Sequence, residues 1–261
     1  MKIVWKKIIN VSIIVLILVL ILIIWEQFVN FYNIPKRILP KPSQILDYLV
    51  SDITTGKSTL YLKTAQSLFD AIIGLAIAMV LGIFVGILFT GHEKLRTIFS
   101  PYMLIVQFLP VPAFAPVVAS MFGYGFETKI CIIVLFTIFP VIVIVEKTIL
   151  NLPENYFALF KTYSVKKLTL YRKLIIPAIV PSLLTTLKIL TTASFVTSII
   201  AELPLTVSSG IGKDIFNSFN NQIITRVWAS LILISMVSLI FFYLVTRLEN
   251  FVLLKYRYGK I

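Results

Sequence analysis

Long apolar stretches alternate with short polar segments along this chain. Six stretches of about 20 residues carry almost no charge, and a helix of that length crosses the hydrocarbon core of a bilayer. Backbone groups in lipid must be satisfied within their own segment, so each stretch is predicted to be a helix and the fold to be all-α and integral to the membrane. The six predicted spans are Ile8–Val29, Leu68–Thr90, Pro101–Phe122, Ile130–Val145, Ser182–Leu203 and Val227–Val245.

Composition agrees with this pattern. Apolar residues make up 59% of the 261 residues and charged residues only 13%, with a mean hydropathy of +0.98. Soluble domains carry about twice that share of charge, so a soluble enzyme, a disordered chain and a small disulfide scaffold are excluded. The net charge of +13 is interpreted as basic loops at a lipid bilayer, and no nucleic-acid partner is expected.

The distribution of Lys and Arg predicts the orientation. With the N-terminus inside, the inner segments carry 15 of these residues and the outer segments eight, with Lys188 inside the fifth span. This bias predicts that both termini are cytoplasmic. We expect one domain over residues 1–261, with an uncleaved anchor helix in 1–35, a core in 36–261 and a long basic inner connection in 146–181.

Catalytic and metal-binding patterns are lacking in the sequence. His92, the one histidine, is predicted to be a solvated loop residue, and no His/Cys cluster or pair of catalytic aspartates occurs. Gly56-Lys57-Ser58 and Gly212-Lys213-Asp214 lack the earlier glycine of a phosphate-binding loop. We therefore expect no cofactor, no metal and no enzymatic activity, and any ATP-derived energy must come from a partner chain.

The second span combines a small-residue face with one charge. Gly74, Ala78, Gly82 and Gly86 recur every four residues, which predicts close approach of a neighbouring helix. Asp70 lies near the outer end of this span. A charge at that depth is either functional or reaches out to the outer surface.

The third and fifth spans carry the candidate pathway residues. Pro110, Pro112 and Pro116 cannot continue a regular helix, so this span either lines a cavity or is kinked for packing. The fifth span is the most polar, and its polar face is expected to line an interior or aqueous path; its candidates are Thr191, Ser194, Ser198 and Glu202. Glu202 either gates the path, contacts solute or caps the outer end, and Lys188 is predicted to extend inward.

Two amphipathic helices are predicted in the inner connection. Pro153 suits a first helical turn, and Tyr156, Phe157, Phe160 and Tyr163 follow at helical spacing. Ser164 is expected to cap a second short helix that stops at Pro177. An exposed aromatic face needs a partner, which is the membrane surface, another part of this chain or a soluble protein with a groove.

At this point the sequence resembles the transmembrane permease subunits of bacterial ABC importers, the binding-protein-dependent inner-membrane component. The similarity is greatest to the group serving nitrate, sulfonate, taurine and thiamine-precursor or riboflavin uptake. It covers about residues 38–257 and rests on Leu39-Pro40-Lys41-Pro42-Ser43, Gly82-Ile83-Phe84-Val85-Gly86, the proline cluster, and Ala201-Glu202 followed by Ser208-Ser209-Gly210-Ile211-Gly212.

The resemblance implies a cytoplasmic loop that docks on an ATPase. The family's Glu-Ala-Ala…Gly loop aligns with Phe157-Ala158-Leu159 and Tyr163, so here only Ala158 and the proline-containing end near Pro177 match. The residues to which the resemblance assigns ATPase coupling are Phe157, Ala158, Leu159, Tyr163, Ser164, Leu168 and Pro177.

The resemblance also implies the partners. They are two cytoplasmic ATPase subunits, an extracytoplasmic solute-binding protein and a second permease subunit, expected to be an identical copy, in a bacterial inner membrane. The small-residue face of the second span is a candidate dimer contact, and the polar face of the fifth span a candidate path. An ATP-independent secondary transporter or channel, a membrane enzyme and a non-transporting scaffold stay open as alternatives.

Overall fold

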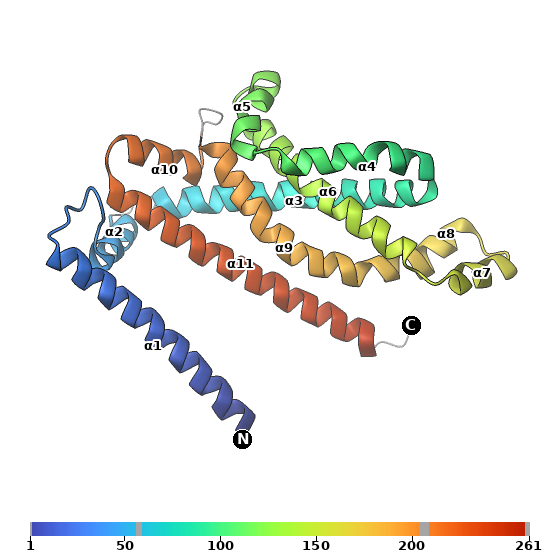
Figure 1. Cartoon of the computed structure of the whole chain (residues 1–261), viewed down its shortest axis with the longest axis horizontal. Helices are drawn as coiled ribbons and strands as arrows, with labels where there is room; N and C mark the ends of the chain where they lie inside the picture. The colour runs from blue at the N-terminus through green and yellow to red at the C-terminus, as the bar shows by residue number, and fades with distance from the viewer. Residues whose placement is uncertain (1, 56–58, 204–208, 259–261) are drawn as a thin grey trace. The chain divides into compact units, whose positions relative to one another are not determined.

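The computed structural model describes residues 2–55, 59–203 and 209–258, and the Gly56-Lys57-Ser58 tripeptide and Ser208 lie outside these ranges. All secondary structure within the described ranges is helical, which confirms the predicted all-α fold (Figure 1). The helices are α1 (Lys2–Phe31), α2 (Pro42–Thr54), α3 (Thr59–Gly91), α4 (Glu93–Phe108), α5 (Val111–Phe122), α6 (Phe126–Leu150), α7 (Glu154–Thr162), α8 (Lys167–Leu170), the π-helix η1 (Tyr171–Ile175), α9 (Ile176–Glu202), α10 (Ile211–Asn220) and α11 (Ile224–Tyr258).

Five of the described helical segments are long and apolar enough to cross a membrane, and a bent pair makes a sixth. The bent pair is α4 and α5, whose axes differ by 108° at a short break. Leu109 takes an extended conformation before Pro110, as residues before proline usually do, and Pro110 then stands at the N-cap of α5. The predicted interruption of the third span is therefore present, although its first half begins at Glu93 rather than at Pro101.

The chain separates into two compact units, Met1–Leu62 with Asp214–Ile234, and Lys63–Lys213 with Ser235–Ile261. In the first unit, the rings of Trp25 and Trp228 lie 5.1 Å apart. Arg226 of α11 donates two hydrogen bonds to the carboxylate of Asp214, at 2.7 and 2.9 Å, and a third to the Tyr48 hydroxyl. Each unit thus has its own packed interior, and the predicted single-domain organisation stays a prediction.

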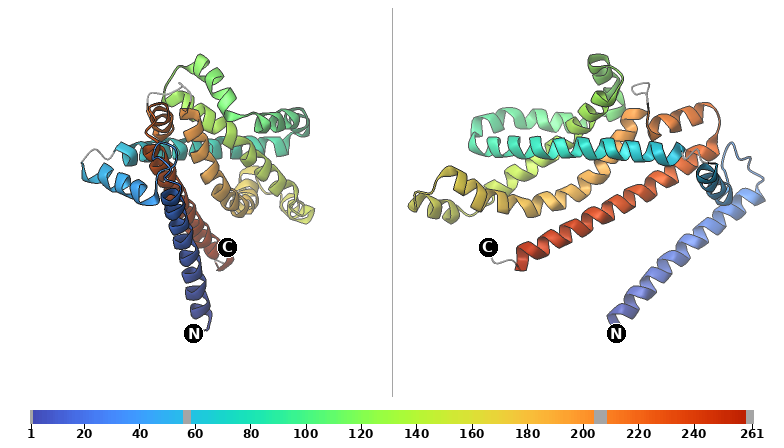
Figure 2. Two further views of the ribbon diagram at one scale, coloured as in Figure 1. Left: turned by 60° about the vertical axis from the view of Figure 1, so that its left-hand side comes forward. Right: turned by 180° about the vertical axis from the view of Figure 1, so that it is seen from behind.

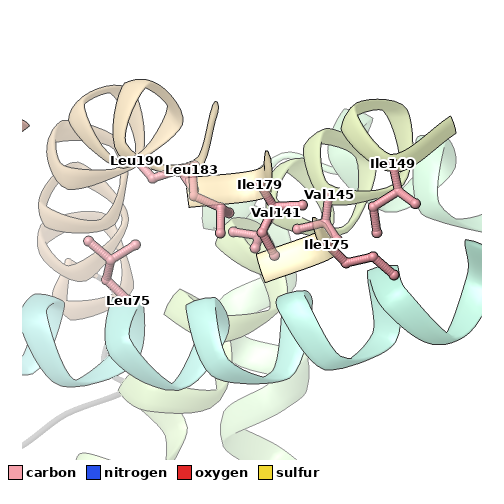
Figure 3. Packing of buried hydrophobic residues seen from close by; sticks show 8 residues of the cluster. All are labelled: Leu75, Val141, Val145, Ile149, Ile175, Ile179, Leu183 and Leu190. Carbon is pink, nitrogen blue, oxygen red and sulfur yellow. The ribbon is translucent and has the colours of Figure 1, made fainter. Parts of the chain in front are cut away.

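The main core of the second unit is formed by α3, α6 and the stretch from η1 into α9. Its side chains are aliphatic throughout, and Figure 3 shows them packed where these helices face one another; they are Leu75, Val141, Val145, Ile149, Ile175, Ile179, Leu183 and Leu190. In a bilayer the lipid is as apolar as these side chains, so close packing rather than exclusion from water holds the helices together.

The small-residue face of α3 packs against α6. A Cβ atom on Gly82 or Gly86 would lie 2.7–2.8 Å from the side chains of Val141 and Val145, respectively, which is too close for real carbon atoms. Gly74 faces Ile133 in the same way. The close approach occurs inside this chain, so the expectation that this face contacts a second subunit was wrong: α6 already covers it.

The helix α4 returns beside α3 in both figures of the whole chain (Figures 1 and 2). Phe89 of α3, Met103 of α4 and Ile142 of α6 form one small buried cluster there. The following helix, α5, packs against an earlier part of α6 and against the end of α9, where Ala115, Val118, Ile132 and Ala201 are buried together. Both halves of the broken span thus contact α6, and only the half after the proline break reaches the end of α9 in this cluster.

The first helix of the long connection, α7, ends differently from the prediction. Ser164 has a φ of +49° and follows the helix end at Tyr163. The Ser164 amide donates to the Lys161 carbonyl and the Val165 amide to the Phe160 carbonyl, a pattern that ends helices. Ser164 therefore ends α7 and does not cap the next helix, and Pro153 is the N-cap of α7 rather than a first-turn residue.

The second predicted short helix does not stop at Pro177. Residues Lys167–Glu202 form a single 36-residue helical stretch through α8, η1 and α9. In η1 the Ile176 amide donates to the Tyr171 carbonyl, five residues back. A proline ring clashes with the carbonyl four residues before it, and the wider π turn just before Pro177 relieves that clash, so the helix continues.

Candidate functional site

Three charged side chains meet inside the second unit. Asp70 on α3, Lys129 on α6 and Glu202 on α9 are 3%, 1% and 1% exposed, and we name them the charge cluster. The Lys129 ammonium pairs with the Asp70 carboxylate and lies 3.1 Å from Oε1 of Glu202. One cation thus connects carboxylates from two other helices.

Polar groups around the charge cluster complete its hydrogen bonds. The Ser67 hydroxyl, one turn before Asp70 on α3, lies 2.7 Å from Oε1 of Glu202 and accepts a bond from the Ile211 amide at 3.0 Å. The Gly212 amide donates to Oε2 of Glu202 at 2.8 Å. Lys129 also donates to the backbone carbonyl of Ser209 at 3.3 Å. The charge cluster therefore binds residues 209–212 as well as three helices.

Two glycines allow this segment to reach Glu202. Gly210 has a φ of +137°, a conformation that side chains rarely allow, and a Cβ atom there would collide with the Glu202 carboxylate. A Cβ on Gly212 would lie 2.8 Å from the Cβ of Glu202. Glycine is needed where the backbone approaches another group so closely. The glycines that follow Ala201-Glu202 in the sequence thus have a direct geometric role.

The two carboxylates of the charge cluster depend on Lys129 for their charge partner. With every group ionised, it holds two negative charges and one positive charge in a buried setting. Charges in a low-dielectric interior attract strongly when paired and are costly when a partner is lost. Removal of the Lys129 ammonium would therefore leave two buried carboxylates without a cation and destabilise the site.

Sequence reasoning missed Lys129. It precedes the apolar run that begins at Ile130, so it was counted among the outer loop charges, whereas the structure places it within α6 and buried. Of the two alternatives for Asp70, the one in which it reaches the outer surface was wrong, because Lys129 pairs with it inside the protein. The sequence does contain a signal for this site: Lys129 lies at the outer end of the fourth predicted span, and Asp70 and Glu202 lie near the outer ends of the second and fifth.

The predicted pathway residues do not share one surface. Thr191, Ser194 and Ser198 of α9 are fully buried, and the Ser198 hydroxyl donates to the backbone carbonyl of Ser67 at 3.1 Å. Pro110, Pro112 and Pro116 are exposed on and beside α5. Of the pathway candidates, only Glu202 belongs to the charge cluster.

A second buried ion pair connects α9 to α11. The Lys188 ammonium lies 2.7 Å from Oε2 of Glu249, and the Thr185 hydroxyl donates to Oε1 of Glu249 at 3.0 Å. Lys188 was predicted to extend inward to the membrane surface. It instead ends on the carboxylate of Glu249, whose side chain is only 6% exposed.

The predicted coupling residues divide into two groups. The exposed group, at the surface of α7, of the turn after it and of α8, consists of Ala158, Leu159, Tyr163, Ser164 and Leu168. Phe157 and Pro177 are half-buried, and Phe157 packs against the aliphatic core of the second unit. A cavity of ≈ 860 Å³ is formed by residues of α7, α8, η1 and the start of α9. It is lined by Phe160, Leu168, Thr169, Arg172, Lys173 and Pro177.

No group of three or more His, Cys, Asp or Glu side chains is arranged to hold a metal ion in the part of the chain that the structure describes. His92 is exposed at the N-cap of α4, with Nδ1 3.1 Å from the Leu88 carbonyl.

Comparison with solved structures gives the fold. The chain superposes on a chain of the inward-facing MetNI methionine ABC transporter with a TM-score of 0.64, covering 75% of this chain and 97% of that one at 16% identity. The described helices of this chain thus follow the arrangement of a known transporter subunit.

Comparison with curated proteins gives relatives of similar length. The formylaminopyrimidine transport permease protein ThiX of Halalkalibacterium halodurans is 28% identical over 236 residues, or 88% of this chain and 90% of that protein. The nitrate import permease protein NrtB of Leptolyngbya laminosa is 26% identical over 220 residues, or 83% of this chain and 78% of that protein. Both are similar to this chain over most of their length.

A family model also matches residues 78–253, which include Lys129, Glu202 and α7. That match covers more than half of the chain, and the resemblance inferred from the sequence is confirmed. The described spans, their packing and these relatives agree on one conclusion: this chain belongs to the binding-protein-dependent transport system inner membrane component family and is the permease subunit of an ABC importer.

Proposed function

We propose that this chain forms, with a second permease subunit, the solute path of a bacterial inner-membrane importer driven by separate ATPase subunits on the cytoplasmic side. An identical copy is the second subunit, and an extracytoplasmic binding protein delivers the solute. Family membership supports the assignment to the importers. The exposed surface of α7 supports α7 as the place where the ATPase subunits bind.

The observation that carries this proposal is the uncovered apolar surface of α7, of the turn after it and of α8. None of the residues of α7 is buried. Leu159, Tyr163 and Leu168 are 53%, 74% and 79% exposed. Side chains of this size gain most when a groove of another protein covers them, and a helix in a groove is a common mode of recognition. The occupant that we propose is the ATPase.

Charge supports placing this surface in the cytoplasm. The segment between α6 and α9 is rich in basic residues, namely Lys147, Lys161, Lys166, Lys167, Arg172 and Lys173. Segments with such an excess of Lys and Arg stay on the cytoplasmic side of a membrane. With the bent pair counted as one span, four crossings lie between the N-terminus and this segment and two between this segment and the C-terminus. An even number of crossings returns the chain to the same side, so both termini are cytoplasmic as well.

The solute is proposed only as a small molecule or ion. The relatives are named for formylaminopyrimidine and nitrate, which differ in size and charge. The charge cluster contains both signs of charge and gives no preference between anionic and cationic cargo.

The test is copurification of the ATPase with variants of this chain. Tyr163→Glu places a charge on the exposed apolar surface and is expected to release the ATPase, because an unpaired carboxylate in an apolar groove loses its hydration. The matched control is Tyr124→Glu, since Tyr124 is a 66% exposed tyrosine before α6, at the opposite end of that helix from α7.

Retention of the ATPase by Tyr163→Glu at the level of Tyr124→Glu would show that α7 is not the docking surface. Solute uptake by the wild-type chain without any ATPase would favour the alternative of a channel or secondary transporter. Membrane insertion of each variant is measured alongside, so that loss of the chain itself is not mistaken for loss of docking.

A further inference from the structure

The cavity formed by α7, α8, η1 and the start of α9 combines cations with apolar side chains. We name this space of ≈ 860 Å³ the basic cavity. Thr169 of α8 and Arg172 and Lys173 of η1 line it at spacings of three and four residues, so the three share one helix face. The rest of its lining is apolar and consists of Phe160, Leu168 and Pro177.

The polar groups of the basic cavity have no partner among the residues that the structure describes. No described carboxylate lies within ion-pair distance of Arg172 or Lys173, and the Thr169 hydroxyl bonds to no described group. The hydroxyls of Thr162 and Thr185, by contrast, donate to carbonyls four residues earlier in their own helices. Thr169 is half-buried, so its hydroxyl is partly shielded from water. The basic cavity therefore offers donors that lack an acceptor.

The surrounding segment does not supply the missing negative charge. Residues 153–181 contain five Lys or Arg and one acidic residue, Glu154. Glu154 lines a different cavity, together with Thr90 and Tyr171. The charge of the basic cavity is therefore complementary to an anion that comes from outside this segment.

The cations of the basic cavity lie at the edge of an apolar run. Lys173 is followed directly by the uncharged residues 174–187, within the helical stretch Lys167–Glu202 that is long enough to cross a membrane. Long cationic side chains at the end of a span extend to the level of the lipid headgroups. The leaflet on the cytoplasmic side carries anionic lipids, and basic pockets beside spans on that side bind their headgroups. A phospholipid is therefore an anion available at this depth.

We propose that the basic cavity binds the phosphate headgroup of an anionic phospholipid from the inner leaflet. Arg172 and Lys173 pair with the phosphate, because a guanidinium can donate two parallel hydrogen bonds to phosphate oxygens and an ammonium adds a compact charge. The Thr169 hydroxyl donates a further hydrogen bond. Phe160 and Pro177 contact the glycerol and the first carbons of the acyl chains. One bound lipid would thus join α7 to the start of α9.

This site goes beyond the proposed function and needs no ATPase. Among the predicted coupling residues, Leu168 and Pro177 line the basic cavity, whereas Leu159 and Tyr163 of the exposed α7 surface do not. The leaflet from which the lipid comes rests on the proposed orientation. Lipid binding to the chain without ATPase subunits tests the site itself, so its failure and the failure of ATPase docking are distinguishable.

The experiment measures phospholipid binding to the full-length chain in nonionic detergent by native mass spectrometry. The probe is phosphatidylglycerol, and phosphatidylcholine with the same acyl chains is the zwitterionic comparison. The wild-type chain is expected to bind phosphatidylglycerol about tenfold more tightly than phosphatidylcholine, equivalent to about 1.4 kcal/mol. Excess inorganic phosphate is expected to leave the lipid bound, because a free ion lacks the contacts with Phe160 and Pro177.

The test variant is Arg172→Gln with Lys173→Gln, and it is expected to lower the affinity for phosphatidylglycerol about tenfold. The matched control is Lys166→Gln with Lys167→Gln, which removes the same two charges from exposed positions that do not line the basic cavity. Its affinity is expected to stay close to the wild-type value. None of the four side chains has an ion-pair partner among the described residues, so neither variant removes a contact of the fold.

Equal loss of affinity in the two double variants would overturn the site, because it would reflect diffuse attraction of a basic surface to anionic lipid. Equal affinity of the wild-type chain for both lipids would do the same. Displacement of the lipid by inorganic phosphate would make the basic cavity a site for a free anion. Release of the ATPase subunits from the assembled importer by the test variant, with lipid affinity unchanged, would assign the basic cavity to an acidic segment of the ATPase.

Discussion

At the scale of single residues, position in the packed fold decides what a charge or a glycine does. Glu202 is surrounded by one cation, one hydroxyl and one backbone amide, and the approach of that amide requires Gly210 and Gly212. Gly123 also has a positive φ, of +83°, but no atom crowds it. These glycines differ in a way that substitution can measure.

We predict that Gly210→Ala lowers the free energy of unfolding more than Gly123→Ala does. Both changes force a side chain into a strained backbone conformation, at a cost of roughly 1–3 kcal/mol. Only the Gly210 change also pushes against Glu202. Unfolding of the purified variants in detergent measures the difference. Equal decreases in the free energy of unfolding would contradict the contact between a Cβ at position 210 and Glu202.

Some of these residue roles could be predicted from the sequence, and others could not. Glu202 and the glycines after it were found because an acidic residue and a Gly-rich motif are visible in one segment. Lys129 and Glu249 were missed because their roles depend on partners 59 and 61 positions away, which only helix packing brings near. The position of a charged residue in the sequence does not show which residue it pairs with.

At the scale of helices, α3 packs closely on α6 in the second unit. Three glycines of α3 face three β-branched side chains of α6, namely Ile133, Val141 and Val145. Repetition of small residues in the sequence predicts a close approach, but it does not say which helix approaches. The neighbour is a helix of the same chain, which sequence spacing does not distinguish from a second copy.

We predict that Gly82→Ala destabilises the protein and that Val141→Ala, added to it, restores part of the loss. The new Cβ would lie 2.7 Å from the Cβ of Val141, and such overpacking costs about 1–3 kcal/mol. The control is Gly91→Ala, where no atom lies within 4 Å. A double-mutant cycle of unfolding free energies measures the coupling, and simple additivity would contradict the contact.

Helix breaks were predictable only in part. The three prolines predicted the interruption between α4 and α5, and the structure has it at Leu109–Pro110. Pro177 was predicted to stop a helix and does not, because the π turn of η1 makes room for its ring. Local sequence marks where a helix is weakened, whereas the surrounding packing decides whether it ends.

At the scale of the whole molecule, the number and apolar length of the spans follow from composition, and loop charge supports the proposed orientation. Burial of Lys129 removes one residue from the outer count of Lys and Arg, leaving seven against 15 inside. The structure therefore strengthens the charge asymmetry on which the proposed orientation depends.

We predict that Ser164→Cys, in a Cys131→Ala background, reacts with a membrane-impermeant maleimide only after the cells are permeabilised. Cys131 is the one cysteine of the chain, so its removal gives a clean background. Tyr124→Cys in the same background is expected to react in intact cells. The reverse labelling pattern would invert the proposed orientation.

The unbroken helical stretch from Lys167 to Glu202 has a mechanical consequence. At 1.5 Å per residue its 36 residues extend over about 54 Å, with no loop to absorb displacement between the two ends. A tilt or shift of its first turns would therefore be transmitted through the continuous helix to the carboxylate of Glu202 at its C-terminal end. The wide turn at η1 is a compliant place in this stretch, so a change in its hydrogen-bond register would rotate the far end while the helix stays continuous.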